Sequence, residues 1–304
     1  MIANSDSNSH NPIHRALKKL IQVLPSGAPR KIYHTALKVP IARDVLGNIV
    51  RSTIPEKVAT NGITLYLDRE DIAVSGSLAL AGFESYETDL FKQALKPGMK
   101  VLDVGAHIGY YSLLAAKAVG PTGRVISFEP EPRNNALLTK NVAANNFKNV
   151  MIVDVAASDT VGTHDFYLEK YNKGHHSFGK GSPTAEKITV TTDSIDNVLK
   201  RAGDPVIDVM KIDIEGAEPI AFRGMQDTIA RSPNLTIFAE IYPSAITRLG
   251  GNALTFLEQL TSYGFKLWVI NEEKQIVEPI RNLAAFTASI PGGENFKNII
   301  AAKE

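Results

Sequence analysis

The stretch KVLDVGAHIGYYSLLAA, residues 100–116, decides the fold of this chain. Its first five residues predict a buried strand, and the apolar run that begins at Tyr110 predicts a helix. Between them, Gly105 and Gly109 supply positions without a Cβ, which a sharp turn and a close helix contact require. A strand, a glycine turn and a helix start together bring backbone N–H groups close to a nucleotide-like ligand.

The residues between and after the two glycines narrow the class of ligand. A dinucleotide-binding turn follows the pattern G-x-G-x-x-G. This chain has His107 and Tyr110 where the second and third glycines of that pattern would stand. Their side chains would block the approach of a pyrophosphate. The turn therefore favours a ligand without a diphosphate, and S-adenosylmethionine is the candidate.

Composition excludes several classes of protein. The chain has 304 residues, a net charge of +1 and no cysteine. This balance argues against nucleic acid as a partner, and the lack of cysteine excludes disulfides, cysteine-ligated zinc and a cysteine nucleophile. No apolar run reaches the length of a membrane span, and the polar start has no signal-peptide core. We therefore expect a cytoplasmic protein without a transmembrane segment.

The first 62 residues differ from the rest in charge. Residues 1–51 contain eight Lys or Arg and two Asp, and their polar start has the composition of a disordered segment. Apolar residues at helical spacing predict an amphipathic helix over 13–24. Two roles stay open for this helix. It packs on the main domain or on a second copy of the chain, or it makes peripheral contact with a membrane. We divide the chain into a basic N-terminal extension, 1–62, and a main domain, 63–304.

From residue 100 onward, predicted strands and helices alternate, which is typical of a doubly wound α/β fold with helices on both faces of a parallel sheet. An inserted hairpin, formed by residues 163–168 and 187–191, interrupts this alternation, and residues 284–301 hold the last strand. The other predicted strands are 100–104, 124–128, 150–154, 207–213, 235–240 and 265–269, and the predicted helices are 110–119, 133–145, 217–230 and 252–262.

Residues that follow the second and third strands are predicted to bind the cofactor, because ligands of open α/β sheets lie beyond the carboxyl ends of the strands. Glu129 ends the second strand, at a spacing from Gly105 that suits an acceptor of hydrogen bonds from ribose hydroxyls. Pro130 fixes the chain after it and is placed near the adenine. Ala156, after the third strand, leaves room for a flat base.

Three acids, Asp213, Glu215 and Glu240, are predicted to lie together at the ends of the fourth and fifth strands. Such a group can bind the ammonium of the cofactor, act as a general base or hold a metal ion. Carboxylates in close contact also need a compensating cation, proton or hydroxyl. Glu218, a little further on, is interpreted as a solvated residue of the first helical turn.

Histidines supply further candidates. His175 and His176 lie in the loop of the inserted hairpin, and one of them is a candidate general base because imidazole titrates near neutrality. The alternative is an exposed loop without a catalytic role. His107, inside the glycine turn, is predicted to contact the cofactor.

Four blocks of sequence, in order, resemble the FkbM family of S-adenosylmethionine-dependent methyltransferases. The blocks are residues 83–91, 96–112, 128–130 and 211–218, and the resemblance covers about residues 83–242. It implies a class I methyltransferase fold, Rossmann-like, with seven strands of which the last is antiparallel. It also implies O-methylation, commonly of a sugar or natural-product hydroxyl. By the same resemblance, Glu87 lies near the methionine end of the cofactor, Asp103, Gly105 and Gly109 line the cofactor loop, Glu129 holds the ribose, and Asp213 stands by the methyl donor.

We therefore expect an O-methyltransferase that moves a methyl group in line from S-adenosylmethionine to a hydroxyl of a small molecule or glycan, with no metal ligand assigned. The candidates for the general base, in order, are Glu215, Glu240 and one of His175 and His176. One alternative is a magnesium-dependent enzyme for a vicinal diol, in which Asp213, Glu215 and Glu240 hold the metal. The other is a non-catalytic cofactor-binding or scaffold protein. The sequence leaves the acceptor and homo-oligomerisation open.

Overall fold

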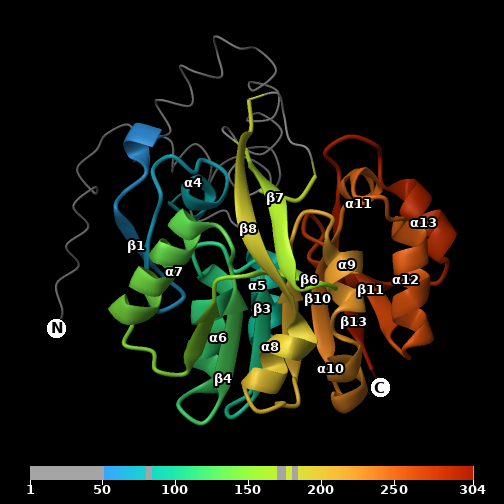
Figure 1. The fold of residues 1–304 in the computed structure, drawn as a ribbon, viewed down its shortest axis with the longest axis horizontal. Helices are drawn as coiled ribbons and strands as arrows, with labels where there is room; N and C mark the ends of the chain where they lie inside the picture. Colours follow the sequence, from blue (N-terminus) through green and yellow to red (C-terminus); the bar gives the residue numbers. More distant parts are fainter. Residues whose placement is uncertain (1–50, 80–83, 170–175, 180–183, 304) are drawn as a thin grey trace.

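The structure, a computed structural model, describes residues 51–303 except 80–83, 170–175 and 180–183. A single eight-stranded sheet organises the main domain (Figure 1). In chain order its strands are β3 (Lys100–Val104), β4 (Arg124–Phe128), β5 (Val150–Val153), β9 (Val209–Ile212), β10 (Thr236–Ile241), β11 (Lys266–Asn271), β12 (Ile276–Pro279) and β13 (Lys297–Ala302).

The spatial order of the strands is β12-β11-β13-β10-β9-β3-β4-β5. The five strands from β10 to β5 are parallel, and β13 lies antiparallel between β10 and β11. This confirms the predicted doubly wound sheet of seven strands with an antiparallel last strand. The short, mostly exposed β12 is an additional edge strand beside β11. Chain order reverses between β3 and β9, which marks the switch point where such folds bind ligands.

Helices cover both faces of the sheet, so every residue of β9 is buried and the central strands are mostly apolar. The buried apolar residues form two large clusters. The first includes residues of α8, α9, α10 and α12, and the second includes residues of α5, α6 and α7. These helices are α5 (Ser85–Ala94), α6 (Tyr110–Val119), α7 (Pro132–Ala144), α8 (Ile195–Arg201), α9 (Glu218–Arg223), α10 (Gln226–Arg231) and α12 (Ala253–Ser262). The remaining helices are α4 (Val74–Ala79), α11 (Pro243–Arg248) and α13 (Leu283–Ser289).

The helix predicted over 217–230 is two helices, α9 and α10, that separate at Gly224. A Cβ on Gly224 would lie 2.0 Å from the carbonyl oxygen of Ser158. The close approach of an inserted strand therefore sets the position of the break.

A hairpin of β1 (Lys57–Thr60) and β2 (Ile63–Tyr66) precedes the main sheet. The side chain of Asn141, on α7, accepts a hydrogen bond from the N–H of Tyr66 and donates one to its carbonyl oxygen. Asn145, one turn later, makes the same pair of bonds to Thr64. Residue 62, where the extension was divided from the main domain, lies in the turn of this hairpin. The helix predicted over 13–24 lies outside the described residues.

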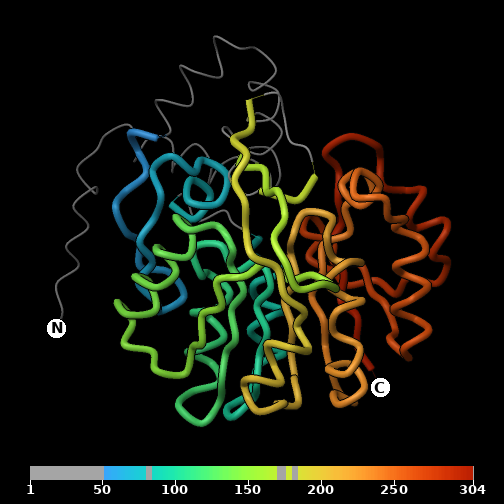
Figure 2. The backbone as a smooth tube through the Cα atoms, viewed as in Figure 1, coloured from blue at the N-terminus to red at the C-terminus, as the bar shows by residue number. Residues whose placement is uncertain are grey.

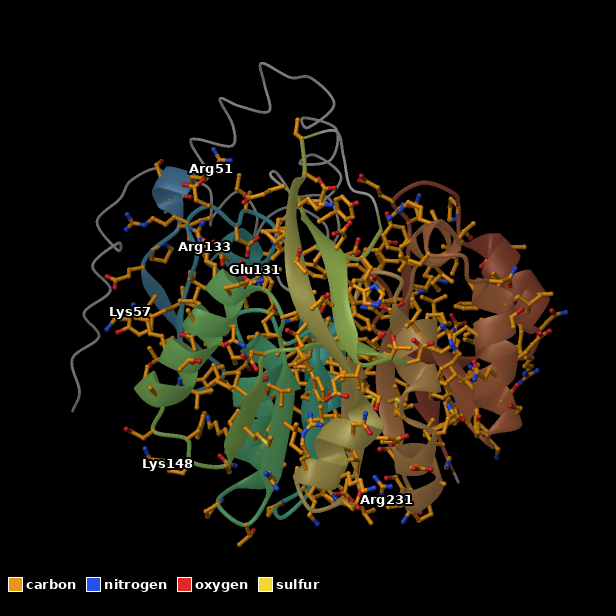
Figure 3. All side chains as sticks on the ribbon, viewed as in Figure 1. Arg51, Lys57, Glu131, Arg133, Lys148 and Arg231 are labelled. Atoms are coloured by element: carbon orange, nitrogen blue, oxygen red, sulfur yellow. The ribbon has the colours of Figure 1, made fainter. Side chains whose placement is uncertain are left out.

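The insertion between β5 and α8 is a three-stranded sheet of β6 (Ala156–Ser158), β7 (Gly162–Leu168) and β8 (Glu186–Ser194). β7 and β8 are antiparallel, which confirms the predicted hairpin, and β6 pairs in parallel with the end of β8. The hairpin rises beyond the carboxyl ends of the central strands, on the side where α4 also lies (Figures 1 and 2). Glu131 and Arg133, at the start of α7, mark this edge of the sheet in Figure 3, and Lys148 marks the opposite edge. Among the described residues, no helix combines the length and the apolar character that crossing a membrane requires.

Candidate active site

The glycine turn after β3 is too crowded for any side chain at its two glycines. Gly105 has φ +86°, and a Cβ there would lie 2.0 Å from the carbonyl oxygen of Asp213. Gly109 has φ +93°, and a Cβ there would lie 2.4 Å from Cδ1 of Leu138 on α7. The N–H groups of residues 105 and 106 both donate to the carbonyl oxygen of Phe128 at the end of β4. The turn is therefore fixed between the ends of β4 and β9.

Asp103 lies beneath this turn and is buried. Its Oδ2 accepts a hydrogen bond of 2.5 Å from the hydroxyl of Ser112, and that hydroxyl lies 2.7 Å from the hydroxyl of Ser127. Burial raises the pKa of Asp103 to about 6, although the Ser112 hydrogen bond lowers it. Asp103 thus holds the first turn of α6 against β3 and β4.

Glu129 faces the glycine turn from the end of β4. Its two carboxylate oxygens accept hydrogen bonds from the backbone N–H groups of His107, at 2.7 Å, and Glu131, at 2.9 Å. Burial raises the pKa of Glu129 to about 8, and these two hydrogen bonds oppose that rise. His107 has left-handed backbone, with φ +51°. Both of its ring nitrogens are buried without a hydrogen-bond partner in the described part of the chain, and Nε2 lies 3.9 Å from Asp71 Oδ2.

Pro130 and Ala156 are the other residues predicted near the base of the cofactor. Pro130 is half-buried between Glu129 and the start of α7. Ala156 is buried at the start of β6, where it packs with Phe166 and Val190 of the insertion. Their contact with the cofactor stays a prediction.

Lys211 is a charged residue of the candidate site that the sequence did not single out. It is 1% exposed in β9, and its Nζ lies 3.2 Å from both Glu87 Oε1 and Asp213 Oδ2. The Glu87 carboxyl also accepts a hydrogen bond from the Nδ2 of Asn298 on β13. Burial raises the pKa of Glu87 to about 8 even though the Lys211 charge lowers it. Burial lowers the pKa of Lys211, but Asp213 and Glu87 outweigh this and hold that pKa well above its usual value. The sequence signal that could have identified Lys211 is its position as the one charged residue in an otherwise apolar strand.

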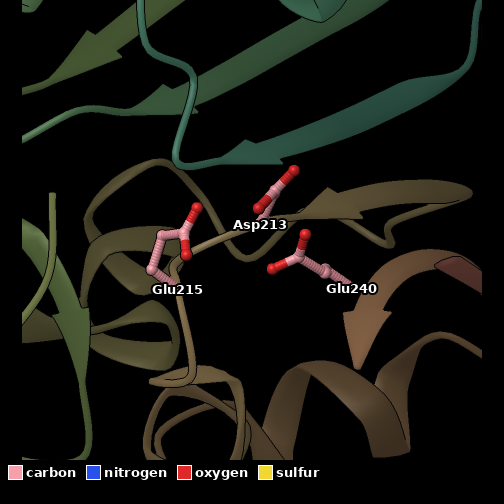
Figure 4. Close-up of side chains that lie close together, drawn as sticks. All are labelled: Asp213, Glu215 and Glu240. Carbon is pink, nitrogen blue, oxygen red and sulfur yellow. The ribbon is translucent and has the colours of Figure 1, made fainter. Parts of the chain in front are cut away.

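The three predicted acids meet at the carboxyl ends of β9 and β10 (Figure 4). One carboxylate oxygen from each of Asp213, Glu215 and Glu240 lies within 4.8 Å of the other two. The turn that places Glu215 is left-handed, with φ +55° at Glu215 and +95° at Gly216. A Cβ on Gly216 would lie 2.5 Å from the carbonyl carbon of Ala245 on α11. Both strand ends are thus held against α11, with the carboxylates directed to one point.

Electrostatics in this carboxylate cluster favour protons or a cation. Burial, followed by the charge of Asp213, raises the pKa values of Glu215 and Glu240 well above their usual range. The nearby Arg248 lowers the pKa of Glu215, and Lys211 lowers that of Glu240, but neither cancels the rise. One carboxylate oxygen of Glu240 is buried without a hydrogen-bond partner in the described residues. A buried carboxylate oxygen without a hydrogen-bond partner is suited to accept a proton or to face a positive ligand.

Glu218 is not the solvated residue that its sequence position indicated. Its side chain is fully buried, and its Oε1 accepts hydrogen bonds from the N–H groups of Ile214 and Gly216. Burial raises its pKa to about 7. Glu218 therefore holds the turn that carries Glu215.

The two loop histidines have separate outcomes. His175 lies outside the described residues. His176 is half-buried, and its Nδ1 accepts a hydrogen bond of 3.0 Å from the N–H of Glu169. The neighbouring Ser177 pairs with Tyr167 of β7. These hydrogen bonds fix His176 beside the end of β7. Its role as a base stays a prediction.

Comparison with known proteins gives one family match. The model of the methyltransferase FkbM domain matches residues 103–267. An arsenite methyltransferase of Halobacterium salinarum is 35% identical over 31% of this chain and 24% of its own length. A probable cobalt-precorrin-6B C(15)-methyltransferase of Sulfolobus acidocaldarius is 27% identical over 50% of this chain and 84% of its own length.

The first curated relatives are thus matched over much less than two thirds of their length, with shares between 24% and 36%. Among solved structures, an O-methyltransferase from Bacillus cereus in complex with S-adenosylhomocysteine aligns with 90% of this chain and 97% of its own. That alignment has 12% identity and a TM-score of 0.43.

Proposed function

The chain belongs to the FkbM methyltransferase family, whose cofactor is S-adenosylmethionine, and from this premise we propose that it is an O-methyltransferase. The acceptor in this proposal is a hydroxyl of a sugar, glycan or natural product. The observation that carries the proposal is the carboxylate cluster of Asp213, Glu215 and Glu240, in which one oxygen of each lies within 4.8 Å of the others. A hydroxyl has a high pKa, so its methylation needs a group that removes the proton.

The residues around the glycine turn fit the cofactor. Gly105 and Gly109 allow the tight turn that brings backbone to the cofactor, because a Cβ at either would clash with Asp213 or Leu138, and the buried carboxyl group of Glu129 faces the same turn. Each oxygen of that carboxylate has a second lone pair, with which it can accept a hydrogen bond from a ribose hydroxyl. Glu87 and Asp213, which share the Lys211 ammonium, would lie toward the methionine end.

In this proposal, the chain aligns the acceptor hydroxyl with the methyl group of the cofactor and removes the hydroxyl proton. When bound, the cofactor supplies a methyl group on a positively charged sulfur. Glu215 and Glu240 are the candidate bases, and each has a pKa raised by burial, so each holds a proton more strongly than an ordinary glutamate. The cluster has more carboxyl groups than the nearby Lys211 and Arg248 can balance, and this surplus favours a positive ligand. Positive charge close by would lower both pKa values and leave a carboxylate ready to accept the hydroxyl proton.

The test is a transfer screen with a labelled methyl group. Purified protein is incubated with labelled S-adenosylmethionine and with sugar nucleotides, oligosaccharides and hydroxylated metabolites, and the products are analysed for the methylated atom. A methyl ether supports the proposal. Methylation at nitrogen or carbon would overturn it. Cofactor binding without transfer to any acceptor would instead favour a cofactor-binding scaffold.

A second candidate is a magnesium-dependent O-methyltransferase of a vicinal diol. The favouring observation is that the three carboxylates are near enough to supply oxygen ligands to one ion. The ion pair between Lys211 and Asp213 argues against it, because the ammonium already compensates one of the three charges. Treatment of active protein with EDTA separates the candidates: full activity eliminates the metal, and loss that magnesium restores establishes it.

A further inference from the structure

Asn298, on β13, is a buried polar residue of the candidate site that the proposed function does not use. It is 8% exposed, and its Nδ2 donates a hydrogen bond to the carboxyl group of Glu87 on α5. The other oxygen of that carboxyl group lies 3.2 Å from the Lys211 ammonium. Asn298 therefore reaches the buried charges of the site from the antiparallel last strand.

Asn298 is also the direct neighbour of Glu240, one of the two candidate bases. β10 and β13 are antiparallel, and Glu240 and Asn298 are partners in their register. Residues directly opposite each other in an antiparallel pair project from the same face of the sheet, with Cβ atoms about 4.5–5.5 Å apart. The Asn298 amide thus adjoins two carboxyl groups, that of Glu87 on α5 and that of Glu240 in the carboxylate cluster.

These two neighbours each have a buried oxygen that lacks a donor. Asn298 Oδ1 and Glu240 Oε2 have no hydrogen-bond partner in the part of the chain that the structure describes. An amide oxygen and a carboxylate oxygen can only accept, so they cannot bond to each other while Glu240 is ionised. Buried acceptors without a donor destabilise the fold. A proton on Glu240 removes both deficits at once, because its O–H can then donate to Asn298 Oδ1.

The charges around Glu240 support a proton at this place. Burial, followed by the charges of three neighbouring acids, raises the pKa of Glu240 well above its usual value, and the Lys211 ammonium only partly opposes this. Glu87 differs, because two donors, Lys211 Nζ and Asn298 Nδ2, face its carboxyl group and favour its ionised form. The charged groups that act on Glu240 are Asp213, Glu215, Glu218 and Lys211.

We propose that Asn298 is a positioning residue of the methyl-transfer centre, whose Oδ1 accepts a hydrogen bond from protonated Glu240 while its Nδ2 holds Glu87. This makes Glu240, and not Glu215, the general base. Glu240 enters the transfer step as a carboxylate. The hydroxyl proton passes to it as the methyl group replaces that proton on the acceptor oxygen, and the sulfur keeps the electron pair of the broken carbon–sulfur bond. Asn298 then binds the new O–H of Glu240. The origin of this proton rests on the proposed function.

The test observes the Asn298 amide by NMR, in protein whose asparagines are isotope-labelled at Cγ and Nδ2, from acidic to alkaline pH. The Asn298 resonances are identified by their absence in Asn298→Asp. We expect the Cγ resonance to shift as the pH rises, because Glu240 loses its proton and Oδ1 loses its hydrogen bond. Asn252, whose Oδ1 accepts a hydrogen bond from the N–H of Thr255, is the internal reference and should not shift.

Variants identify the group that Oδ1 senses. Glu240→Gln should keep the Asn298 Cγ resonance at its acidic position at every pH, because the glutamine amide donates to Oδ1 permanently. Glu215→Gln is the matched control: it removes a carboxyl group of the same cluster and should preserve the shift. Glu87→Gln should change the Nδ2 resonance and preserve the Cγ shift. The natural shift in Glu240→Gln, its loss in Glu215→Gln, or no shift in the natural protein would overturn the inference. A buried water between the two oxygens would give the last result.

Kinetics test the role of Asn298 with an acceptor from the transfer screen. Asn298→Leu has a similar shape but can neither donate nor accept, so kcat should fall about tenfold, as expected for the loss of one hydrogen bond. Asn298→Asp keeps an acceptor for the Glu240 proton and adds a negative charge, so the increase of rate with pH should move to higher pH. An unchanged kcat and pH profile in both variants would overturn the inference. If no acceptor is methylated, the proposed function fails, and the NMR result still decides whether Asn298 binds the Glu240 proton.

Discussion

The backbone N–H of His107 donates a 2.7 Å hydrogen bond to the carboxylate of Glu129, so the glycine turn after β3 and the end of β4 form one unit. The turn also packs closely against the end of β9, because a Cβ on Gly105 would lie 2.0 Å from the carbonyl oxygen of Asp213. The ends of β3, β4 and β9 are thus joined through the turn. The predictions below test this unit, the carboxylate cluster and the buried charges that connect them.

Above pH 8, where the Glu129 carboxyl is ionised, Glu129→Ala should weaken S-adenosylmethionine binding by about 1.5–3 kcal/mol, because a hydrogen bond to a charged acceptor contributes about that much. Isothermal titration calorimetry measures the change. Asp154→Ala, an exposed acid just after the neighbouring β5, is the control and should bind like the natural protein. Equal affinity in the Glu129 variant would remove Glu129 from the ribose site.

Gly105→Ala should abolish cofactor binding or unfold the turn. The residue has φ +86°, and the added methyl group would lie 2.0 Å from the carbonyl oxygen of Asp213. Gly264→Ala is the matched control: its φ is +84°, close to that of Gly105, but nothing lies within 4 Å of the added Cβ. That control should lose only about 1–2 kcal/mol of stability from backbone strain. Thermal unfolding and calorimetry compare the two, and similar losses in both would show that crowding at Gly105 is unimportant.

Glu240→Gln should lower the rate of methyl transfer by about 10²–10⁴-fold if Glu240 is the general base. In the natural protein, the raised pKa values of Glu215 and Glu240 mean that the carboxylate forms gain population as the pH rises. The rate should therefore increase from acidic toward alkaline pH, and the variant should lose this dependence. Glu258→Gln, on the exposed face of α12, is the control. If Glu240→Gln keeps full activity and Glu215→Gln is inactive, the general base is Glu215 and not Glu240.

Lys211→Met should reduce the free energy of unfolding by about 3–5 kcal/mol, because it leaves the buried Glu87 and the half-buried Asp213 without their common cation. The loss should be smaller at acidic pH, where the Glu87 carboxyl binds a proton. Adding Glu87→Gln to the variant should restore part of the stability at neutral pH. Denaturant unfolding at two pH values measures all three effects. A Lys211→Met protein as stable as the natural one would show that the ion pairs contribute nothing.

The whole chain should become less stable as the pH rises through neutrality. Burial raises the pKa of Glu87 and Glu129 to about 8 and that of Glu218 to about 7, from an ordinary value of 4.5. Between 4.5 and these values the folded chain binds more protons than the unfolded chain, so the free energy of unfolding falls with increasing pH. Thermal unfolding in a series of buffers should show a midpoint that declines across this range. Glu129→Gln should flatten the decline, and a midpoint that rises over the same range would contradict these pKa values.

The sequence could predict the central strands because burial on both faces makes most of their residues apolar. The strand predicted over 100–104 has the same bounds in the structure, and its glycine turn follows directly. The break between α9 and α10 could not be predicted, since it depends on contact between Gly224 and Ser158, which are far apart in the chain. The edge strand β12 was missed because it is short and mostly exposed.

The candidate site was partly predictable for a similar reason. The carboxyl ends of parallel strands meet at one edge, so acids that follow different strands were expected to meet, and Asp213, Glu215 and Glu240 do. The pattern of residues does not show which acids are buried and what they contact. Glu218 therefore could not be recognised as a support for the turn, nor Lys211 as the partner of both Glu87 and Asp213.

The insertion leaves and rejoins the main domain at adjacent points, since Ala156 pairs with Thr192 and Ser158 pairs with Ser194. A segment whose two ends are neighbours can be exchanged for another of different length without moving the strands on either side. The glycine turn and Glu129 lie before this segment, and the carboxylate cluster lies after it. Foreign hairpins can thus be grafted between residues 158 and 194 while the glycine turn, Glu129 and the carboxylate cluster keep their places at the ends of the main strands.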